Sequence, residues 1–503
     1  MVQSERKKIN IIGGGVGGLT AAARLSSMGF QVTLFEKNGY CGGRCSRVSR
    51  DGFSWEQGAI LYLFSDIYEE TFAELGESIE SHVDIIHYTD HHKVFFGNGK
   101  TFEYTTSMDK LLETIEIFEK DSDSCQKNLI SFLKECEKFR DIVYNLVFNS
   151  TYDSYWDLIN VDLITRLPSI PLGSSMYDIV SKYFQSDEVR QALTFQALYF
   201  GISPFKGSGL FTVLPATELL RGIWYPKGGM VSVVNALEKI ATQKFGVEIV
   251  YNSSVDKIEI DSQGKAIGVR LSNETFHPSD AVISNADLTY TYNKLLPQTS
   301  YGDHLASVDN VPSTITFFWG LSKQLTRLKA HNIFLPLDYE KLFRQIHEDK
   351  IVPDDPAFYI HIANRMDPEL APTGKDALTV LVPVGAMADS SVNFDKLVLQ
   401  LKEKIINSLE NRLEISDFSS LIETELVETP ETWEFKYNAW KGTILGINHN
   451  LTNLLAFRPS QKSSFFKNLY FTGASTQPGA GVPVVMKSAR LLAPKIQADL
   501  RDD

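Results

Sequence analysis

The hydrophobic pattern at the start of the chain contains two short apolar runs with a helical segment between them. Residues 8–12 (KINII) form a run typical of a buried strand, and residues 31–36 (QVTLFE) form a second, β-branched run. Between them, residues 19–29 (LTAAARLSSMG) carry apolar side chains at helical spacing and end at Gly29, where a helix C-terminus favours glycine. The pattern predicts a strand–turn–helix–strand unit with a right-handed, parallel crossover.

Helical periodicity dominates the chain from residue 109 to residue 222, and strand patterns dominate the part that follows. Residues 109–150 place apolar side chains on one helical face, and residues 151–222 indicate further helices separated by prolines. Short β-branched runs return between residues 247 and 383. The last run, 468–473, leads through a Gly/Pro turn into a helix from Val484.

These patterns predict an α/β protein in which a Rossmann-type nucleotide-binding domain is interrupted by two insertions. The first insertion is helical, and the second is a strand-rich, mixed sheet that we expect to bind the substrate. The first, third and last of the expected segments form the nucleotide-binding domain. The segments are 1–108, 109–224, 225–300, 301–425 and 426–503.

The overall composition excludes several classes of partner and binding site. A net charge of -13 argues against a nucleic-acid partner, which would require a basic face. The 4 cysteines and 10 histidines show no zinc-ligand spacing, so no metal is expected. The polar N-terminus lacks a signal-peptide pattern, and no run reaches the roughly 18 apolar residues of a membrane-spanning helix. We therefore expect an intracellular protein, either cytoplasmic or peripherally associated with a membrane.

The turn after the first strand carries the chemistry of a dinucleotide site. Gly13, Gly15 and Gly18 fit the Gly-x-Gly-x-x-Gly pattern, in which the glycines allow a tight turn, close approach to a pyrophosphate and close helix packing. Glu36 ends the second strand, where a carboxylate can accept hydrogen bonds from a ribose. A glycine-rich turn without a ligand is the alternative interpretation.

Two further segments favour FAD as the dinucleotide. In Cys41-Gly42-Gly43-Arg44, a guanidinium flanked by glycines can reach the same pyrophosphate. Residues 469–490 (LYFTGASTQPGAGVPVVMKSAR) form a strand, a Gly/Pro turn and a helix whose N-terminus can face the bound group. The structural alternatives are an exposed turn and a plain strand–helix connection.

The chain resembles the carotenoid (phytoene) desaturase family of flavoenzymes, within the amine-oxidase-like flavoprotein superfamily. The resemblance covers nearly the whole chain, is closest to the fungal phytoene dehydrogenases, and is most specific from residue 331 onward. The segments that carry it include IIGGGVGGLTAAARL, the GGR run, WYPKGGM (224–230), VISNADLTY (282–290), HNIFLPLDY (331–339), GTILGINHNLTNLLAFRP (442–459) and GASTQPGAGVP (473–483).

This resemblance implies a GR2-like FAD-binding domain and the dehydrogenation of a long isoprenoid such as phytoene. A hydride would leave an allylic carbon for flavin N5, and a proton would leave the neighbouring carbon. The partners it implies are an apolar isoprenoid substrate and, for a peripheral enzyme, a membrane surface. Relatives usually carry His where this chain has Gln477, and fungal relatives tend to have a C-terminal apolar anchor beyond the position of Asp503.

Pattern and resemblance together give a set of candidate site residues. The expected catalytic residues are Glu56, in a loop near the flavin ring, and Gln477. The expected FAD-binding residues are Gly13, Gly15, Gly18, Glu36, Lys37, Gly43, Arg44, Gly58, Val255, Gly473, Gly481, Val482 and Val484.

Two other features have more than one interpretation. The aromatic segment 193–214 predicts either core packing or the wall of a long apolar tunnel. His91 and His92 are expected at a polar hairpin edge. Two other functions also stay open: an FAD oxidase of another lipophilic substrate, and a non-catalytic carrier of a prenyl lipid, which the intact glycine motif disfavours.

Overall fold

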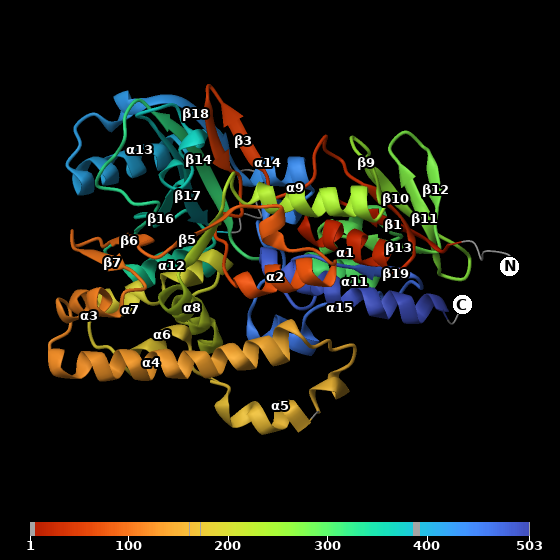
Figure 1. Ribbon diagram of the computed structural model, residues 1–503, viewed down its shortest axis with the longest axis horizontal. Coiled ribbons are helices and arrows are strands. Elements are labelled where there is room, and N and C mark those ends of the chain that lie inside the picture. Colours follow the sequence, from red (N-terminus) through yellow and green to blue (C-terminus); the bar gives the residue numbers. More distant parts are fainter. Residues whose placement is uncertain (1–5, 160, 172, 386–392, 502–503) are drawn as a thin grey trace.

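The computed structural model describes residues 6–159, 161–171, 173–385 and 393–501 (Figure 1). A parallel five-stranded sheet with the order β19-β13-β1-β2-β9 forms the centre of the nucleotide-binding domain. The strands are β1 (Lys8–Ile12), β2 (Gln31–Phe35), β9 (Glu248–Val250), β13 (Ala281–Ser284) and β19 (Leu469–Phe471). The Rossmann-type α/β fold predicted from the sequence is confirmed.

Helices α1 (Val16–Ser27), α2 (Ser65–Glu74), α9 (Val231–Lys239) and α15 (Val482–Arg501) pack together beside this sheet. The apolar side chains of β1 and of α1 are buried in one core with those of α9 and α15, which explains why the β1–α1–β2 pattern was readable from sequence. A three-stranded antiparallel sheet formed by β10 (Val255–Ile260), β11 (Ala266–Leu271) and β12 (Phe276–Pro278) flanks the domain.

A second, seven-stranded sheet has the order β18-β14-β17-β16-β15-β6-β7. Alternation along its strands sends one set of side chains toward α13 (Phe394–Leu413) and the other set toward the interior of the molecule. The strands are β6 (His92–Phe95), β7 (Thr101–Tyr104), β14 (Ser313–Leu321), β15 (His331–Phe334), β16 (Phe358–Ile362), β17 (Asp376–Val384) and β18 (Ile422–Glu428).

Two expectations for the N-terminal part need correction here. Residues 92–104, assigned from sequence to the first part of the nucleotide-binding domain, form β6 and β7 of the seven-stranded sheet because β6 pairs in parallel with β15. His91 and His92, expected at a polar hairpin edge, are fully buried. The reason is that β6 lies between two other strands rather than at an edge.

The helical insertion lies at the lower end of the view in Figure 1. It is joined to the rest of the molecule by the antiparallel pair of β5 (Ile85–Tyr88) and β8 (Ile223–Pro226). Its helices are α3 (Met108–Glu116), α4 (Ser122–Ile142), η2 (Val143–Phe148), η3 (Tyr155–Leu158), α5 (Val161–Arg166), η4 (Leu167–Ser169), α6 (Met176–Ser181), α7 (Asp187–Ala192), η5 (Phe195–Phe200), η6 (Gly209–Thr212) and α8 (Val213–Arg221).

Further elements connect these parts. They include β3 (Arg47–Arg50), β4 (Phe53–Glu56), α10 (Leu288–Tyr290), η8 (Thr291–Leu295), α11 (Ser300–Ser307), α12 (Tyr339–His347) and α14 (Pro430–Tyr437).

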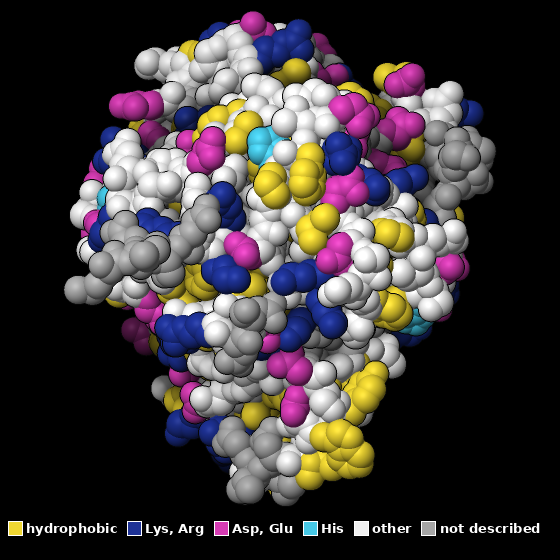
Figure 2. All heavy atoms as spheres, turned by 90° about the vertical axis from the view of Figure 1, so that its right-hand side faces the viewer, with side chains coloured by type: hydrophobic (Ala, Val, Ile, Leu, Met, Phe, Trp, Pro, Cys, Tyr) yellow, Lys and Arg dark blue, Asp and Glu magenta, His cyan; other side chains and the backbone are white. Residues whose placement is uncertain are grey.

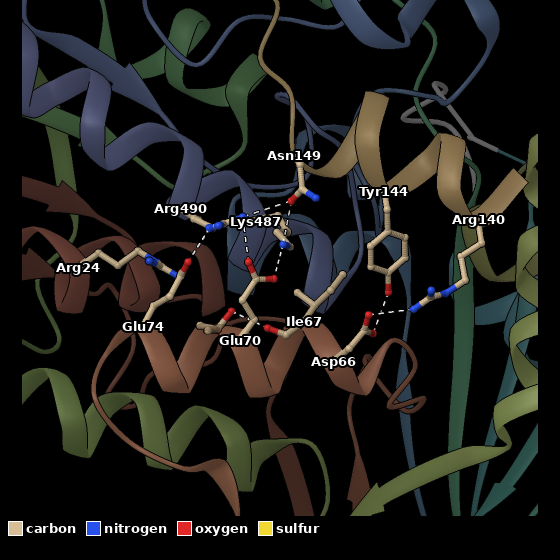
Figure 3. A network of polar contacts seen from close by, with 11 residues as sticks. Arg24, Asp66, Ile67, Glu70, Glu74, Arg140, Tyr144, Asn149, Lys487 and Arg490 are labelled. Atoms are coloured by element: carbon tan, nitrogen blue, oxygen red, sulfur yellow. Dashed lines mark hydrogen bonds and ion pairs between the residues drawn. The ribbon is translucent and has the colours of Figure 1, made fainter. Parts of the chain in front are cut away.

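A polar network fastens the helical insertion to α15 (Figure 3). Lys487 of α15 is buried, pairs with Glu70 of α2 and donates to Asn149 Oδ1 at 2.9 Å. Arg490, one turn later on α15, pairs with Glu70 at 2.9 Å and donates to Glu74 at 2.8 Å. A buried ammonium is stable only when it is paired, so this network holds α2, α15 and the end of η2 in one arrangement.

Candidate functional site

One cavity of about 380 Å³ extends from the carboxyl ends of the parallel strands to the inner face of the seven-stranded sheet. Open parallel sheets bind their ligands at this edge, because the strand-to-helix turns meet there. Ile12, Gly13 and Glu36 line one end, and Ile333 and Leu381 line the other. The nucleotide-binding domain and the second sheet therefore share a single site.

The glycine-rich turn forms the first wall of the cavity. Gly13 has a φ of +93°, which favours glycine, and Gly13 and Gly15 both line the cavity. A Cβ on Gly15 would lie 2.9 Å from Asn285 Nδ2, and one on Gly18 would lie 2.2 Å from the Gly13 carbonyl oxygen. Gly18 is not among the described residues that line the cavity. Its role is to let α1 pack closely on β1.

Glu36 and Lys37 follow β2 and line the cavity beside this turn. The Glu36 carboxylate accepts hydrogen bonds from the backbone N–H groups of Gly14 at 2.7 Å and Asn38 at 2.8 Å. These bonds fix a buried acceptor where a ribose hydroxyl would lie. The Lys37 ammonium is instead directed to α14, where it donates to the Phe435 carbonyl at 2.5 Å and to Asn438 Oδ1 at 2.9 Å.

Arg44 is placed opposite the glycine-rich turn by two glycines. Gly42 and Gly43 both have positive φ, and the Gly42 N–H donates to the Gly14 carbonyl at 2.8 Å. Arg44 lines the cavity and donates to the Ile444 carbonyl. Burial lowers the pKa of Arg44, and the nearby Asp287 carboxylate opposes that shift.

The C-terminal segment supplies the opposite wall. Gly473 and Gly481 have φ values of +120° and +112°, and α15 begins at Val482 directly beside the cavity. Val484, Val255 and Gly58 also line the cavity. A Cβ on Gly58 would lie 2.5 Å from the Arg44 carbonyl oxygen, so this position admits only a close backbone approach.

These residues fit a flavin dinucleotide. The first α-helix points its N-terminus, through Gly15 and Gly17, at the space where a pyrophosphate would lie, and a second helix N-terminus faces it from α15. The candidate FAD-binding residues other than Gly18 all line this one cavity, and they come from both ends of the chain and from its middle.

Sequence reasoning missed several residues of the cavity wall, two of which are polar and follow β13. Asn285 and Asp287 line the cavity just after β13, and Asn285 Nδ2 donates to the Gly13 carbonyl at 3.1 Å. Burial raises the pKa of Asp287, and Arg44 opposes the shift. The sequence contained a signal for both residues, because they directly follow a buried strand. The carboxyl end of that strand lies at the same edge of the sheet as the glycine-rich turn.

The two expected catalytic residues lie outside the cavity wall that the described residues form. Glu56, expected in a loop near the flavin ring, ends strand β4 and is 3% exposed. Its carboxylate accepts the Met230 N–H at 2.7 Å, and its other oxygen lies 3.4 Å from His361 Nδ1. Burial raises the pKa of Glu56 to about 8, against weaker opposing effects of Met230 and Arg47.

Gln477 is held entirely by backbone groups. Its amide accepts from the Tyr152 N–H at 3.0 Å and donates to the carbonyls of Tyr152 at 2.7 Å and Arg458 at 3.3 Å. With its three contacts made this way, the side chain ties the helical insertion to the C-terminal segment. The expected catalytic role of Gln477 stays a prediction, and the observed contacts are those of a side chain that joins two segments.

The end of the cavity away from the glycine-rich turn is apolar. Part of the aromatic segment 193–214 lines it, so this segment contributes both to the core and to the cavity wall. This apolar half is lined by Leu61, Leu63, Phe64, Phe195, Leu198, Tyr199, Phe200, Ile333, Phe358, Tyr359, Leu381 and Pro383.

Comparisons with known proteins agree with this architecture. The family model of flavin containing amine oxidoreductases matches residues 16–496. The phytoene desaturase of Fusarium fujikuroi is 39% identical, over 98% of this chain and 90% of its own length. That of Phycomyces blakesleeanus is 36% identical, over 97% of this chain and 85% of its own length.

A solved structure supports the fold alone. A double mutant of putrescine oxidase superimposes with a TM-score of 0.65 at 14% identity and covers 98% of this chain and 99% of its own. Within the described part of the chain, the helices are too short or too polar to cross a membrane.

Proposed function

This chain belongs to the flavin containing amine oxidoreductases and, among them, to the phytoene desaturases, and on that premise we propose that it desaturates a long isoprenoid such as phytoene. FAD is its cofactor. When bound, FAD supplies the acceptor for the hydride that leaves the substrate. The protein's own residues hold the two reactants together and determine what surrounds them.

The observation that carries the proposal is the continuity of the cavity. Its glycine-lined end offers helix N-termini, Arg44 and Glu36, which suit a pyrophosphate and a ribose. Its other end offers leucine, isoleucine and aromatic side chains, which suit a hydrocarbon. A substrate without polar groups can be oriented only by the shape of its site. The reaction therefore requires an apolar cavity wall opposite the cofactor.

The test uses the purified protein and its visible spectrum. We expect flavin absorbance in the protein as isolated, anaerobic bleaching on mixing with liposomes that contain phytoene, and new absorbance of longer polyenes. The matched control is the same liposome without phytoene. A flavin that stays oxidised while phytoene is recovered unchanged would contradict the proposed substrate.

We also infer that the protein meets its substrate at a membrane surface. Phytoene is insoluble in water, so the enzyme must reach it in a lipid phase. Apolar side chains gather at the lower end of the face in Figure 2, the end where Figure 1 places α5. Tyr155, Trp156 and Ile159 precede α5 and are 66%, 78% and 66% exposed, and the Tyr155 ring lies 5.4 Å from that of Phe457.

Liposome sedimentation checks this inference. The variant Trp156→Ser should sediment less with liposomes than the wild type, because an interfacial aromatic side chain is lost. The matched control is Phe435→Ser, which removes an equally exposed aromatic side chain from α14. Equal binding by both variants and the wild type would place the membrane contact elsewhere.

A further inference from the structure

A buried arginine lies directly behind the C-terminal wall of the cavity. Arg458 follows the short helix η14 (Leu455–Phe457) and is 1% exposed. Arg458 is not among the described residues that line the cavity, but its guanidinium donates to the carbonyl oxygen of Ala474, which does line it. A positive charge is therefore held one residue behind the wall.

Backbone carbonyls satisfy the whole guanidinium group. An arginine side chain has five N–H donors, and Arg458 makes one hydrogen bond for each of them. Nε donates to the Thr476 carbonyl at 3.0 Å. The two Nη groups donate to the carbonyls of Ile447 at 3.3 Å, Asn448 at 3.2 Å, Asn453 at 3.1 Å and, in a short contact, Ala474. These bonds fix residues 474–476 of the cavity wall against residues 447–453.

No carboxylate compensates this charge within the described part of the chain, since every group that Arg458 binds is a carbonyl. Arg44, across the cavity, differs because the Asp287 carboxylate lies nearby. Burial lowers the pKa of Arg458 to about 9, so the guanidinium keeps its charge at neutral pH. A buried charge without a counter-ion is costly, and the adjoining cavity can hold a group that becomes negative.

The segment 473–481, in front of this charge, joins the two halves of the cavity. A Cβ on Gly473 would lie 3.4 Å from Asn285 Oδ1, and the Asn285 amide also donates to the glycine-rich turn. A Cβ on Gly481 would lie 3.8 Å from the ring of Phe200, which belongs to the apolar half. A flavin that binds the turn through its pyrophosphate and meets an apolar substrate must therefore lie along this segment.

A neutral histidine supports the same segment. His449 Nε2 accepts the Ala480 N–H at 3.4 Å, and the His449 ring meets that of Phe200 edge-on at 6.1 Å. Burial, together with the nearby charge of Arg458, lowers the pKa of His449 well below its ordinary value, so His449 is uncharged at neutral pH. The positive charge at this part of the wall is that of Arg458.

Building on the proposed function, we propose that Arg458 is a positioning residue that makes bound FAD a stronger oxidant. During desaturation the allylic C–H bond breaks, and its hydrogen passes with the electron pair to the uncharged flavin ring, which is reduced and gains one negative charge. The neighbouring C–H bond releases its proton to water, and its electron pair becomes the π bond of the new C=C, so the substrate is oxidised. The fixed guanidinium stabilises the charge that the ring gains and so favours its reduction.

Coulomb's law gives the size of the effect. At an effective dielectric constant of about 20, opposite unit charges about 12 Å apart change an equilibrium by roughly tenfold. Because the guanidinium of Arg458 contacts the carbonyl of a cavity-lining residue, we expect at least this factor. A tenfold change in the equilibrium for a two-electron reduction corresponds to about 30 mV in the reduction potential.

Equilibration of the FAD-loaded protein with reference redox dyes, without phytoene, measures this potential. Arg458→Gln removes the charge and keeps two N–H donors, so it should make reduction at least about tenfold less favourable, a fall of about 30 mV. The matched control is Arg412→Gln. Arg412 of α13 also donates to backbone carbonyls, those of Phe95 at 3.1 Å and Leu335 at 2.9 Å, but it lies on the side of the second sheet that faces away from the cavity. Equal potentials of wild type and Arg458→Gln would overturn the proposal.

Arg458→Lys separates the charge from the hydrogen bonds. Lysine restores a positive charge but offers three donors in place of five. The lysine and glutamine variants should therefore both unfold at lower urea concentration than wild type, while the potential of the lysine variant stays within about threefold of the wild-type equilibrium. Equal losses of potential in both variants would show that Arg458 only shapes the wall, and the proposal would be wrong.

The wild-type protein gives a result even if no variant retains FAD. Its bound FAD should be at least about 30 mV easier to reduce than free FAD, and a potential at or below that of free FAD would overturn the proposal. These measurements use no phytoene, so a wrong substrate in the proposed function would leave them unchanged. If wild-type protein reduces its flavin with phytoene but Arg458→Gln keeps the wild-type potential, only the role of Arg458 is wrong.

Discussion

Replacing Glu56 by glutamine should stabilise the protein, and the gain should grow with pH. Glu56 is 3% exposed, and burial raises its pKa from an ordinary value of 4.5 to about 8. Between these values the unfolded chain carries an ionised carboxylate while the folded protein carries a neutral acid. Folding then takes up a proton, so the stability contribution is complete below pH 4.5 and is lost as the pH rises toward 8.

The size of the stability gain follows from the shift in the pKa of Glu56. Each pH unit above 4.5 costs about 1.4 kcal/mol, which gives roughly 3 kcal/mol at pH 7 and about 5 kcal/mol above pH 8. Glutamine keeps the shape and an acceptor for the Met230 N–H, and its amide can donate to His361 Nδ1, which lies 3.4 Å from the present oxygen. Glutamine is uncharged in both the folded and the unfolded state, so the variant does not lose stability as the pH rises.

Thermal unfolding at a series of pH values is the assay. An unfolding entropy of about 1 kcal/mol per degree for 503 residues converts the gain into roughly 3 °C at pH 7 and 5 °C above pH 8. The control Glu116→Gln alters an exposed carboxylate of α3 and should show no such slope. A difference between Glu56→Gln and wild type that stays constant from pH 5 to pH 8 would refute the reasoning.

Three other substitutions follow from contacts described above. Gly15→Val should abolish flavin retention, because its side chain would enter the cavity and press on Asn285; a yellow purified variant would contradict this. Gln477→Ala should lower the free energy of unfolding by about 3 kcal/mol through three lost backbone contacts, measured in urea, while flavin reduction in the folded variant stays at the wild-type rate. Lys487→Met should cost roughly 2 kcal/mol in the same urea titration, since Glu70 and Asn149 lose their buried cation but Arg490 remains; an unchanged midpoint would show that the network contributes nothing.

The residues that line the glycine-rich end of the cavity could be predicted because the pattern that identifies them is local in sequence. A tight turn, a helix N-terminus and an acid at a strand end are each set by a few neighbouring residues, so Gly13, Gly15 and Glu36 could be read directly. Lys37 shows where prediction from local sequence fails. It lies at the expected place, yet its ammonium turns to α14, whose position depends on contacts with distant residues.

The contacts of Gln477 and of the buried histidines could not be predicted, because they are assembled by long-range pairing. Gln477 meets Tyr152 across 325 residues of sequence. His92, His331 and His361 become neighbours only through the register of three strands, one of them parallel. A histidine pair in a short loop-like segment resembles a solvent-exposed turn until the parallel partner strand is known, which explains the wrong expectation for His91 and His92.

The order of the strands along the chain also determines the stage of synthesis at which the site can form. β19 forms an edge of the parallel sheet, and Gly473, Gly481 and Val482 close the cavity beside it. Ribosomes deliver these residues after every other part of the described nucleotide-binding sheet, at about 5–20 residues per second. Strands β1, β2, β9 and β13 are therefore synthesised before β14 to β18 of the second sheet, and the cavity can enclose the cofactor only after Val482 has been added to the chain.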